Sequence, residues 1–133
     1  MCSVLGNSRL PDIYFRSDGR IDITADVVAE LGIHDGDVID IWQEDKEQLL
    51  YILHRSENIF GRHIAVCHGT RKHHKYMRAW CVKLCRHILS VCGGDAREAH
   101  LFVGLPIEHP RIGKAIPIIT KNNLFKKAIK DGR

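Results

Sequence analysis

The chain has 133 residues, of which 44% are apolar, which is enough for the core of one ordinary domain or two very small ones, so we expect a folded protein and not a disordered one. No apolar run approaches the roughly 18 residues that can span a bilayer, and the five cysteines lack the spacing of a disulfide framework. We therefore expect a cytoplasmic protein with reduced thiols and no membrane contact, whose net charge of +4 conceals a strong asymmetry between its two halves.

The first half of the chain predicts two strands, a short helix and two further strands. Apolar and polar residues alternate over residues 13–23 on either side of Ser17-Asp18-Gly19, which is typical of a β-hairpin. Thr24 is a candidate N-cap for a helix of about two turns that ends at Gly32. Residues 38–42 and 49–53 predict the other two strands, and the near-continuous apolar character of the latter indicates burial on both faces.

The second half predicts a strand, a long helix and two strands. Residues 62–67 form the first strand candidate, and the polar run that follows at residues 68–75 favours an exposed loop. Residues 76–92 give a helical wheel with a basic face and an apolar face, which predicts one long amphipathic helix. Residues 100–105 and 115–120 are strand candidates around a turn. The apolar face consists of Met77, Trp80, Cys81, Leu84, Cys85, Ile88, Leu89, Val91 and Cys92.

Two segments of the first half carry a resemblance to a known family. The first begins Gly19-Arg20-Ile21-Asp22-Ile23-Thr24 and ends Leu31-Gly32-Ile33, and the second reads Asp35-Gly36-Asp37-Val38-Ile39-Asp40-Ile41. They resemble the AbrB/MazE-like swapped-hairpin transcription factors, a SpoVT-AbrB type of cradle-loop barrel, over about residues 12–55. The turn also makes physical sense, because Gly36 can adopt positive φ and Asp37 can accept backbone N–H bonds.

The resemblance implies an α+β fold and a homodimer that binds DNA. In that family two chains interleave their hairpins, because four short strands of one chain cannot close a barrel, and basic side chains of the dimer contact DNA. Arg20 matches a basic position of the family motif, and Arg16 is a nearby candidate. We therefore predict a swapped-hairpin module (β-β-α-β-β) at residues 1–57, followed by a β-α-β-β region at residues 58–133.

The charge distribution favours the second half as the site of any contact with nucleic acid. Residues 1–57 contain 5 Lys/Arg and 12 Asp/Glu, a net charge of −7, whereas residues 58–133 contain 15 Lys/Arg and 4 Asp/Glu, a net charge of +11. An acidic surface repels the phosphates of DNA. Two interpretations stay open: the basic half binds a polyanion, or the two halves dock on each other. For Arg20 the alternative to a DNA contact is a pair with Asp18 or Asp22.

A basic stripe across the predicted loop and helix is the leading candidate for a nucleic-acid contact. Its members with the strongest claim are Arg71, Lys72, Lys75 and Arg78, and a continuous run of positive charge is the electrostatic footprint of a nucleic-acid binder. The alternative is a solvated helix face, or a face that docks on the acidic half. The stripe also includes His73, His74, Lys83 and Arg86, and the basic tail with Lys126, Lys127, Lys130 and Arg133 could extend it.

Cysteine and histidine residues are dense between residues 67 and 92, which raises a zinc hypothesis. Their spacing is poor for zinc, because Cys81 and Cys85 lie on the apolar face of the predicted helix, where cysteine behaves as a small hydrophobic residue. We therefore favour a core role for Cys81, Cys85 and Cys92. The sequence contains no phosphate loop, carboxylate pair or zincin signature, and we expect neither enzyme activity nor a metal or cofactor.

These observations lead to one main functional hypothesis and one alternative. The main hypothesis is a DNA-binding, transcription-regulator-like homodimer. The alternative is a non-enzymatic structural or protein-interaction module, of the kind found in mobile elements or phages, that does not bind nucleic acid. Dependence of DNA binding on salt concentration distinguishes the two.

Overall fold

The computed structural model of the protein describes residues 12–45, 49–57, 64–70, 76–92 and 97–120. The predicted α+β class is confirmed, with ten strands and two helices in these residues. In chain order the elements are β1 (Ile13–Arg16), β2 (Arg20–Ile23), α1 (Ala25–Leu31), β3 (Val38–Asp45), β4 (Leu49–Ser56), β5 (Ala65–Val66), β6 (His68–Gly69), β7 (Met77–Trp80), α2 (Val82–Cys92), β8 (Glu98–Leu101), β9 (Ile107–His109) and β10 (Gly113–Ile118).

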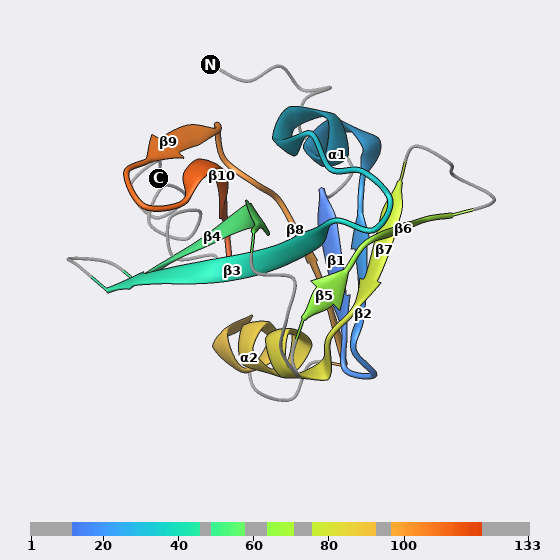
Figure 1. The fold of residues 1–133 in the computed structure, drawn as a ribbon. Helices are drawn as coiled ribbons and strands as arrows, with labels where there is room; N and C mark the ends of the chain where they lie inside the picture. The colour runs from blue at the N-terminus through green and yellow to red at the C-terminus, as the bar shows by residue number, and fades with distance from the viewer. Residues whose placement is uncertain (1–11, 46–48, 58–63, 71–75, 93–96, 121–133) are drawn as a thin grey trace, which may run out of the picture.

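The strands form two antiparallel sheets of five strands each (Figure 1). Sheet A has the strand order β6-β7-β2-β1-β8, and sheet B has the order β5-β3-β4-β10-β9. Both sheets contribute to one apolar core, for example through Phe15 of sheet A and Leu53 of sheet B. The helices lie at opposite ends of this core, and their buried residues, such as Val27 in α1 and Ile88 in α2, belong to it.

The first hairpin and the short helix form as the sequence predicts. Gly19 has a φ of 104°, as the tight turn between β1 and β2 requires, and α1 ends at Gly32, which has the left-handed φ of 66°. Thr24 is the N-cap residue of α1, but its hydroxyl donates to the carbonyl of Asp12 at 3.0 Å and does not cap the helix. This bond ties the start of α1 to the residue that precedes β1.

The Gly36-Asp37 turn connects the first half of the chain to the second. Gly36 has a φ of 92°, and the carboxylate of Asp37 accepts the N–H of His34 at 2.7 Å, so both predicted roles are confirmed. The N–H of Gly36 donates to the carbonyl of Cys67 at 2.7 Å, and the N–H of Cys67 donates to the carbonyl of Asp37 at 2.8 Å. These two bonds hold the β5–β6 segment against the turn that leads into β3.

The hairpins of the first half find their partner strands within the same chain. In sheet A, β7 pairs with β2 and β8 pairs with β1, so both edges of the first hairpin are covered. In sheet B, β5 pairs with β3 and β10 pairs with β4. The swapped-hairpin arrangement is therefore not confirmed: the second half of the chain supplies the strands that the resemblance assigns to a second copy.

The prediction of one long helix over residues 76–92 is wrong for the first part of this range. Residues Met77–Trp80 form strand β7, and only Val82–Cys92 form helix α2. The strand has the alternation of a half-buried strand, because Ala79 is buried while Trp80 is exposed. Pairing with β2 along its whole length supplies backbone hydrogen bonds that a helix would otherwise make internally. The predicted basic helix face is therefore divided, with Arg78 on β7 and Lys83 on α2.

The other strands of the second half differ from the prediction mainly in their bounds. The strand candidates at residues 62–67, 100–105 and 115–120 correspond to β5, β8 and β10. The predicted loop after β5 contains the exposed two-residue strand β6. The predicted turn at residues 106–113 contains β9. Neither helix in the described part of the chain is long and apolar enough to cross a membrane.

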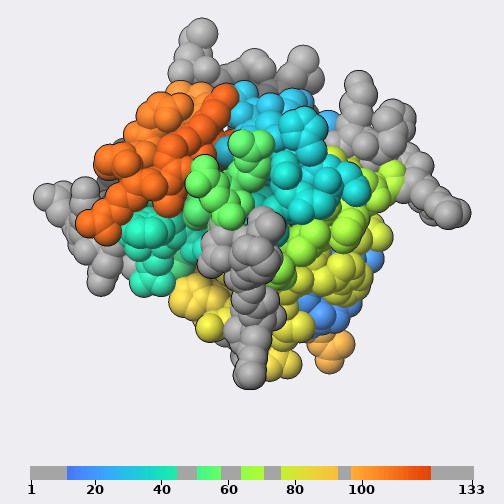
Figure 2. Space-filling view, viewed as in Figure 1, coloured from blue at the N-terminus to red at the C-terminus, as the bar shows by residue number. Residues whose placement is uncertain are grey.

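The acidic and basic halves of the chain dock on each other. Each sheet combines strands from both sides of residue 57, where the sequence analysis placed a domain boundary. Ion pairs also connect the halves, such as Asp22 to Arg78 at 2.7 Å and Glu30 to Lys114 at 3.4 Å. Figure 2 shows the β9–β10 hairpin, in orange, packed beside the blue and cyan residues of the first half. One of the two interpretations of the charge asymmetry, mutual docking, is thus observed.

Replacement of Gly36 by valine tests the role of the turn. The Cβ atom would meet no atom within 4 Å, so the cost of Gly36→Val comes from positive φ alone, and we expect the free energy of unfolding to fall by about 1–3 kcal/mol. Gly69→Val is the matched control, because Gly69 also has open space around it but lies in a strand with ordinary φ, and we expect a change within about 0.5 kcal/mol. Denaturant unfolding of both variants measures the difference, and equal stabilities would contradict the assigned role of the turn.

Candidate nucleic-acid interface

The outer face of sheet A gathers polar, basic and aromatic side chains. Side chains alternate in direction along a strand, so that Ile13 and Phe15 of β1 point into the core while Tyr14 and Arg16 point away from it. The same alternation applies along the other strands of the sheet. The side chains on the outer face are Tyr14 and Arg16 in β1, Arg20 and Asp22 in β2, His68 in β6, Arg78 and Trp80 in β7, and Glu98 and His100 in β8.

The strand register arranges these side chains in rows across the sheet. Adjacent strands lie about 4.8 Å apart, so a row that crosses all five strands measures about 19 Å. In a neighbouring row Trp80 stands opposite Arg20. The ring centroids of Tyr14 and His100 are 4.7 Å apart, so one end of the longest row is a pair of packed rings. The longest row consists of His68, Arg78, Asp22, Tyr14 and His100.

Asp22 holds two arginine side chains in place. Its carboxylate accepts the Nε–H of Arg20 at 3.0 Å and the Nε–H of Arg78 at 2.7 Å. Asp22 is 8% exposed, which means that these charge-assisted bonds form in a partly desolvated setting where they are strong. The sequence-based alternative for Arg20, a pair with Asp22, is therefore observed. Each guanidinium still has four N–H donors besides the one that Asp22 accepts.

Arg16 is bound less tightly than the other two arginines. Its Nε lies 3.8 Å from the nearer carboxylate oxygen of Glu98, which is an ion pair but too long for a hydrogen bond. This nitrogen is buried and has no hydrogen-bond partner in the described part of the chain. Arg16 thus has donor capacity that the described residues do not use.

Three arginines and three aromatic residues line one hollow of about 820 Å³ on this face of the sheet. Among the described residues of the lining Asp22 is the one acidic side chain, and His68 also borders the hollow. Three positive charges against one negative charge make its surface basic, although β1 and β2 belong to the acidic half of the chain. We call the six residues that define this surface the arginine face: Tyr14, Arg16, Arg20, Tyr76, Arg78 and Trp80.

The Tyr14 hydroxyl of the arginine face is uncharged at neutral pH. Burial, with Tyr76 as the next contribution, raises the pKa of Tyr14 above its ordinary value. A neutral phenol donates a hydrogen bond and presents an apolar ring, whereas a phenolate would repel an anion. The aromatic residues therefore do not weaken the positive character of the arginines.

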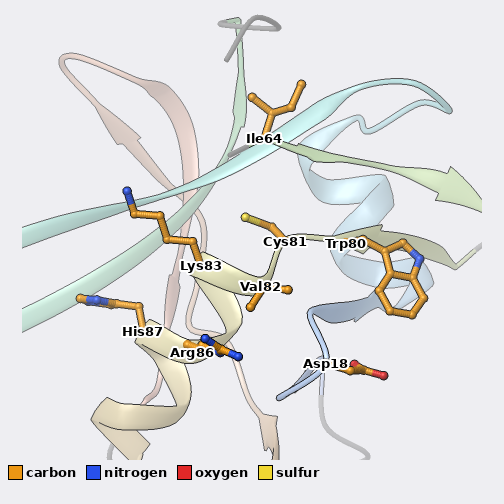
Figure 3. Close-up of a pocket in the computed structure, with 8 residues that line it drawn as sticks. All are labelled: Asp18, Ile64, Trp80, Cys81, Val82, Lys83, Arg86 and His87. Carbon is orange, nitrogen blue, oxygen red and sulfur yellow. The ribbon is translucent and has the colours of Figure 1, made fainter. Parts of the chain in front are cut away.

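A second hollow, of about 760 Å³, lies where β7 passes into α2 (Figure 3). Figure 3 shows Lys83, Arg86 and His87 of α2 on one side of it and Trp80 on the other, with Cys81 between them. We call it the helix hollow. Trp80 also lines the arginine face, so the two surfaces are adjacent and share this side chain.

The structure brings together part of the predicted site. Arg16 and Arg20, the candidates from the family motif, lie in one hollow with Arg78, a candidate from the basic stripe. Arg71, Lys72 and Lys75 lie outside the described residues. Lys83 and Arg86, which the sequence placed in the same stripe as Arg78, instead line the helix hollow.

Sequence reasoning missed the aromatic residues of the site. Trp80 was assigned to the buried face of a helix, but 52% of its surface is exposed. A period of two over residues 77–80, with Met77 and Ala79 inward and Arg78 and Trp80 outward, is the signal that could have identified the strand.

The cysteines of the described residues belong to the core. Cys81 and Cys85 are buried and Cys92 is partly buried against the core, which confirms the role favoured from the sequence. Burial raises the pKa of Cys67 to about 12 and that of Cys85 to about 11, so both are protonated thiols at neutral pH. A protonated thiol is a poor nucleophile and a poor metal ligand. Within the described residues no three His, Cys, Asp or Glu side chains group as metal ligands would.

Comparison of the chain with protein-family models, with curated proteins and with solved structures found no match.

Replacement of Asp22 by asparagine tests the bridge between the two arginines. We expect Asp22→Asn to lower the free energy of unfolding by about 1–3 kcal/mol, because two arginines lose a charged acceptor in a partly desolvated site. Asp40→Asn is the control: it removes the same charge from an exposed carboxylate on β3, and we expect a change within about 0.5 kcal/mol. Thermal and denaturant unfolding measure both values, and an Asp22→Asn protein as stable as the unmodified chain would show that the bridge is not structural.

The buried thiols predict a loss of stability at alkaline pH. In the unfolded chain a cysteine ionises near its ordinary pKa of 9.0, while Cys67 keeps its proton in the folded protein to about pH 12. The unfolded state therefore binds fewer protons above pH 9, and the stability falls by up to about 1.4 kcal/mol per pH unit for this thiol. Denaturant unfolding at about pH 7, 9 and 10.5 should show little change over the first interval and the main decline over the second, because the unfolded thiol ionises above pH 9. In Cys67→Ala the decline should be shallower, and an equal slope would contradict the assignment.

Proposed function

We propose that the protein binds DNA through the arginine face and acts as a transcription-regulator-like protein. The observation that supports this most is the convergence of Arg16, Arg20 and Arg78 from three strands in one hollow with three aromatic residues. Phosphate contacts supply most of the non-specific affinity for DNA, and a guanidinium binds a phosphate through two parallel N–H groups. The regulator-like role rests in addition on the resemblance of residues 12–55 to the AbrB/MazE-like family.

The charge of the lining residues answers the objection that the first half of the chain is too acidic to bind DNA. The net charge of −7 over residues 1–57 counts carboxylates from all sides of the module. Among the described lining residues of the arginine face only Asp22 is acidic, and it orients Arg20 and Arg78 through their Nε atoms. Glu98, which pairs with Arg16 at 3.8 Å, adds a second carboxylate beside the face, so a phosphate that approaches the hollow meets three guanidinium groups and two carboxylates, a net charge of +1.

The homodimer stays a prediction. The reason for it in the sequence analysis was that the hairpins leave unpaired edges, and these edges are paired within the chain. The strands at the edges of the two sheets, β6, β8, β5 and β9, are two to four residues long. Sedimentation at micromolar concentration gives 15.2 kDa for a monomer and about twice that mass for a dimer.

An interaction module without nucleic acid is the second candidate function. It is favoured by apolar side chains that lie exposed near one another in the chain: Leu105 is 85% exposed and Ile107 is 37% exposed. Exposed apolar groups of this kind are typical of contacts with other proteins when they form a patch. Failure of the unmodified protein to bind DNA at low salt would leave this candidate.

The salt dependence of binding tests the arginine face. The fourfold variant Arg16→Gln/Arg20→Gln/Asp22→Asn/Arg78→Gln removes all three arginines, and it includes Asp22→Asn so that this buried carboxylate is not left without its arginine partners. On duplex DNA we expect the slope of log affinity against log salt to become shallower by up to about 2.7, or about 0.9 for each of three lost phosphate contacts. Fluorescence anisotropy of a labelled duplex at several salt concentrations measures the slope.

A charge-matched control separates local contacts from net charge. The fourfold variant removes three positive charges and one negative charge, and Arg111→Gln/Lys114→Gln also lowers the net charge by two, at the β9–β10 hairpin of sheet B. We expect this control to keep the slope of the unmodified protein. Equal slopes for the fourfold variant and the control would place the contact elsewhere. The substitution of Arg71, Lys72 and Lys75 to glutamine then measures how much the predicted basic segment contributes to the salt slope.

A further inference from the structure

We infer that the nucleic acid bound by this protein is a single strand, which crosses the arginine face and continues over Trp80 into the helix hollow. The inference rests on the proposed function and adds to it the class of ligand and a second contact surface. It depends on the shape of sheet A, on the exposure of Trp80 and on the charges of the helix hollow.

The sheet that carries the arginine face is too broad to enter the major groove of duplex DNA. The major groove of B-DNA is about 12 Å wide and admits a helix or a two-stranded ribbon. The arginine face lies on a five-stranded sheet whose longest row of side chains measures about 19 Å. A B-form duplex therefore meets a flat sheet of this width first through its backbone, with its base edges recessed in the grooves. A single strand has no groove, and its unstacked bases can lie directly on a sheet that carries aromatic side chains.

Trp80 has the exposure of a stacking platform. It is 52% exposed, although an indole of this size is usually covered by the core. It stands opposite Arg20 in the strand register, so a base packed on the indole would have its phosphate within reach of a guanidinium. Stacking of a base on an aromatic side chain contributes about 1–3 kcal/mol and is tolerant of sequence. An exposed tryptophan beside arginines therefore suits a ligand with accessible base faces.

The helix hollow supplies two further positive charges beyond Trp80. Lys83 and Arg86 follow one another along α2 on one side of the hollow with the ring of His87 beside them, and Asp18 is the one acidic residue among its described lining residues (Figure 3). Lys83 and His87 also line a third, smaller hollow of about 260 Å³ against β3 and β4. The helix hollow shares Trp80 with the arginine face and Lys83 with the third hollow, whose lining also includes Asp40. The hollows therefore adjoin one another, as contacts that follow the backbone of a single strand require.

Gly19 fixes the junction between the two surfaces. The carbonyl of Gly19 accepts the N–H of Cys81 at 2.8 Å, which attaches the start of α2 to the β1–β2 turn. A Cβ atom on Gly19 would lie 2.8 Å from Cγ2 of Val82 and 3.1 Å from its backbone nitrogen, so a side chain at this position would separate the two. The arginine face and the helix hollow therefore keep a fixed relation, as a ligand that spans both requires.

Binding of short oligonucleotides tests the inference. We compare an oligo(dT) of about 12 nucleotides, within the range of about 4–16 that single-strand sites cover, with a duplex of equal length and with oligo(rU). The oligo(dT) should bind more tightly than the duplex. Trp80→Ala should weaken oligo(dT) binding by about 5- to 150-fold and leave duplex binding nearly unchanged, because a stacking contribution of about 1–3 kcal/mol is lost. Oligo(rU) binding as tight as oligo(dT) would identify RNA as an equal ligand of the same track.

Two further measurements locate the strand. Because the chain has two tryptophans, Trp42→Phe leaves Trp80 as the sole indole, and its fluorescence should be quenched by oligo(dT). Lys83→Gln/Arg86→Gln should flatten the salt slope for oligo(dT) by up to about 1.4, or about 0.7 for each lost contact, while Arg111→Gln/Lys114→Gln should not change it.

The outcomes distinguish this inference from the proposed function. If the protein binds duplex at least as tightly as oligo(dT), and Trp80→Ala changes neither, the single-strand inference fails while DNA binding stands. If the slope for oligo(dT) is unaffected by Lys83→Gln/Arg86→Gln, the helix hollow is not part of the track. If the unmodified protein binds none of the three oligonucleotides at low salt, both the inference and the proposed function fail.

Discussion

Strand pairing between the two halves of the chain is the constraint on which the rest of the structure depends. The hairpins β1–β2 and β3–β4 each have two open edges, and β7, β8, β5 and β10 cover all four. Because β7 lies against β2, Arg78 stands beside Asp22, and because β8 lies against β1, Glu98 stands beside Arg16. The arginine face therefore exists only when both halves are paired, and neither half contains it alone.

Charged side chains both stabilise sheet A and order the arginine face. A carboxylate of the acidic half, Asp22, fixes Arg20 of the same half and Arg78 of the basic half in a place where water is partly excluded. Because these two arginine side chains are already ordered, less conformational entropy is lost when a ligand binds to them. The same bonds join β2 to β7, so an interaction that stabilises the sheet also arranges the surface. The stability of the sheet and the proposed binding therefore both depend on this carboxylate.

Local signals in the sequence predicted the strands and turns of the first half well. The errors in the second half arise because strand pairing between distant residues decides its structure. Gly19, Gly32 and Gly36 lie at positive φ where the sequence placed turns and a helix end, because these conformations depend on one residue and its neighbours. Residues 77–80 fit a helical wheel as well as a strand, and only the pairing with β2, more than fifty residues away, decides between them. The approach of Arg78 to Arg16 and Arg20 depends on that same pairing, so composition could identify the arginines but not their convergence.

The order in which the strands are synthesised gives the pairing between halves a kinetic consequence. Both hairpins of the first half leave the ribosome before β7, β8 and β10 exist, and until then their edges present unpaired N–H and C=O groups. Contacts between residues this far apart in the chain form slowly, because a long loop must close before they contribute any free energy. A nascent chain that pauses after β4 is therefore exposed to pairing with another chain at the edges that β7 and β8 later occupy. Faster completion of sheet A would protect the protein from aggregation without any change to its final structure.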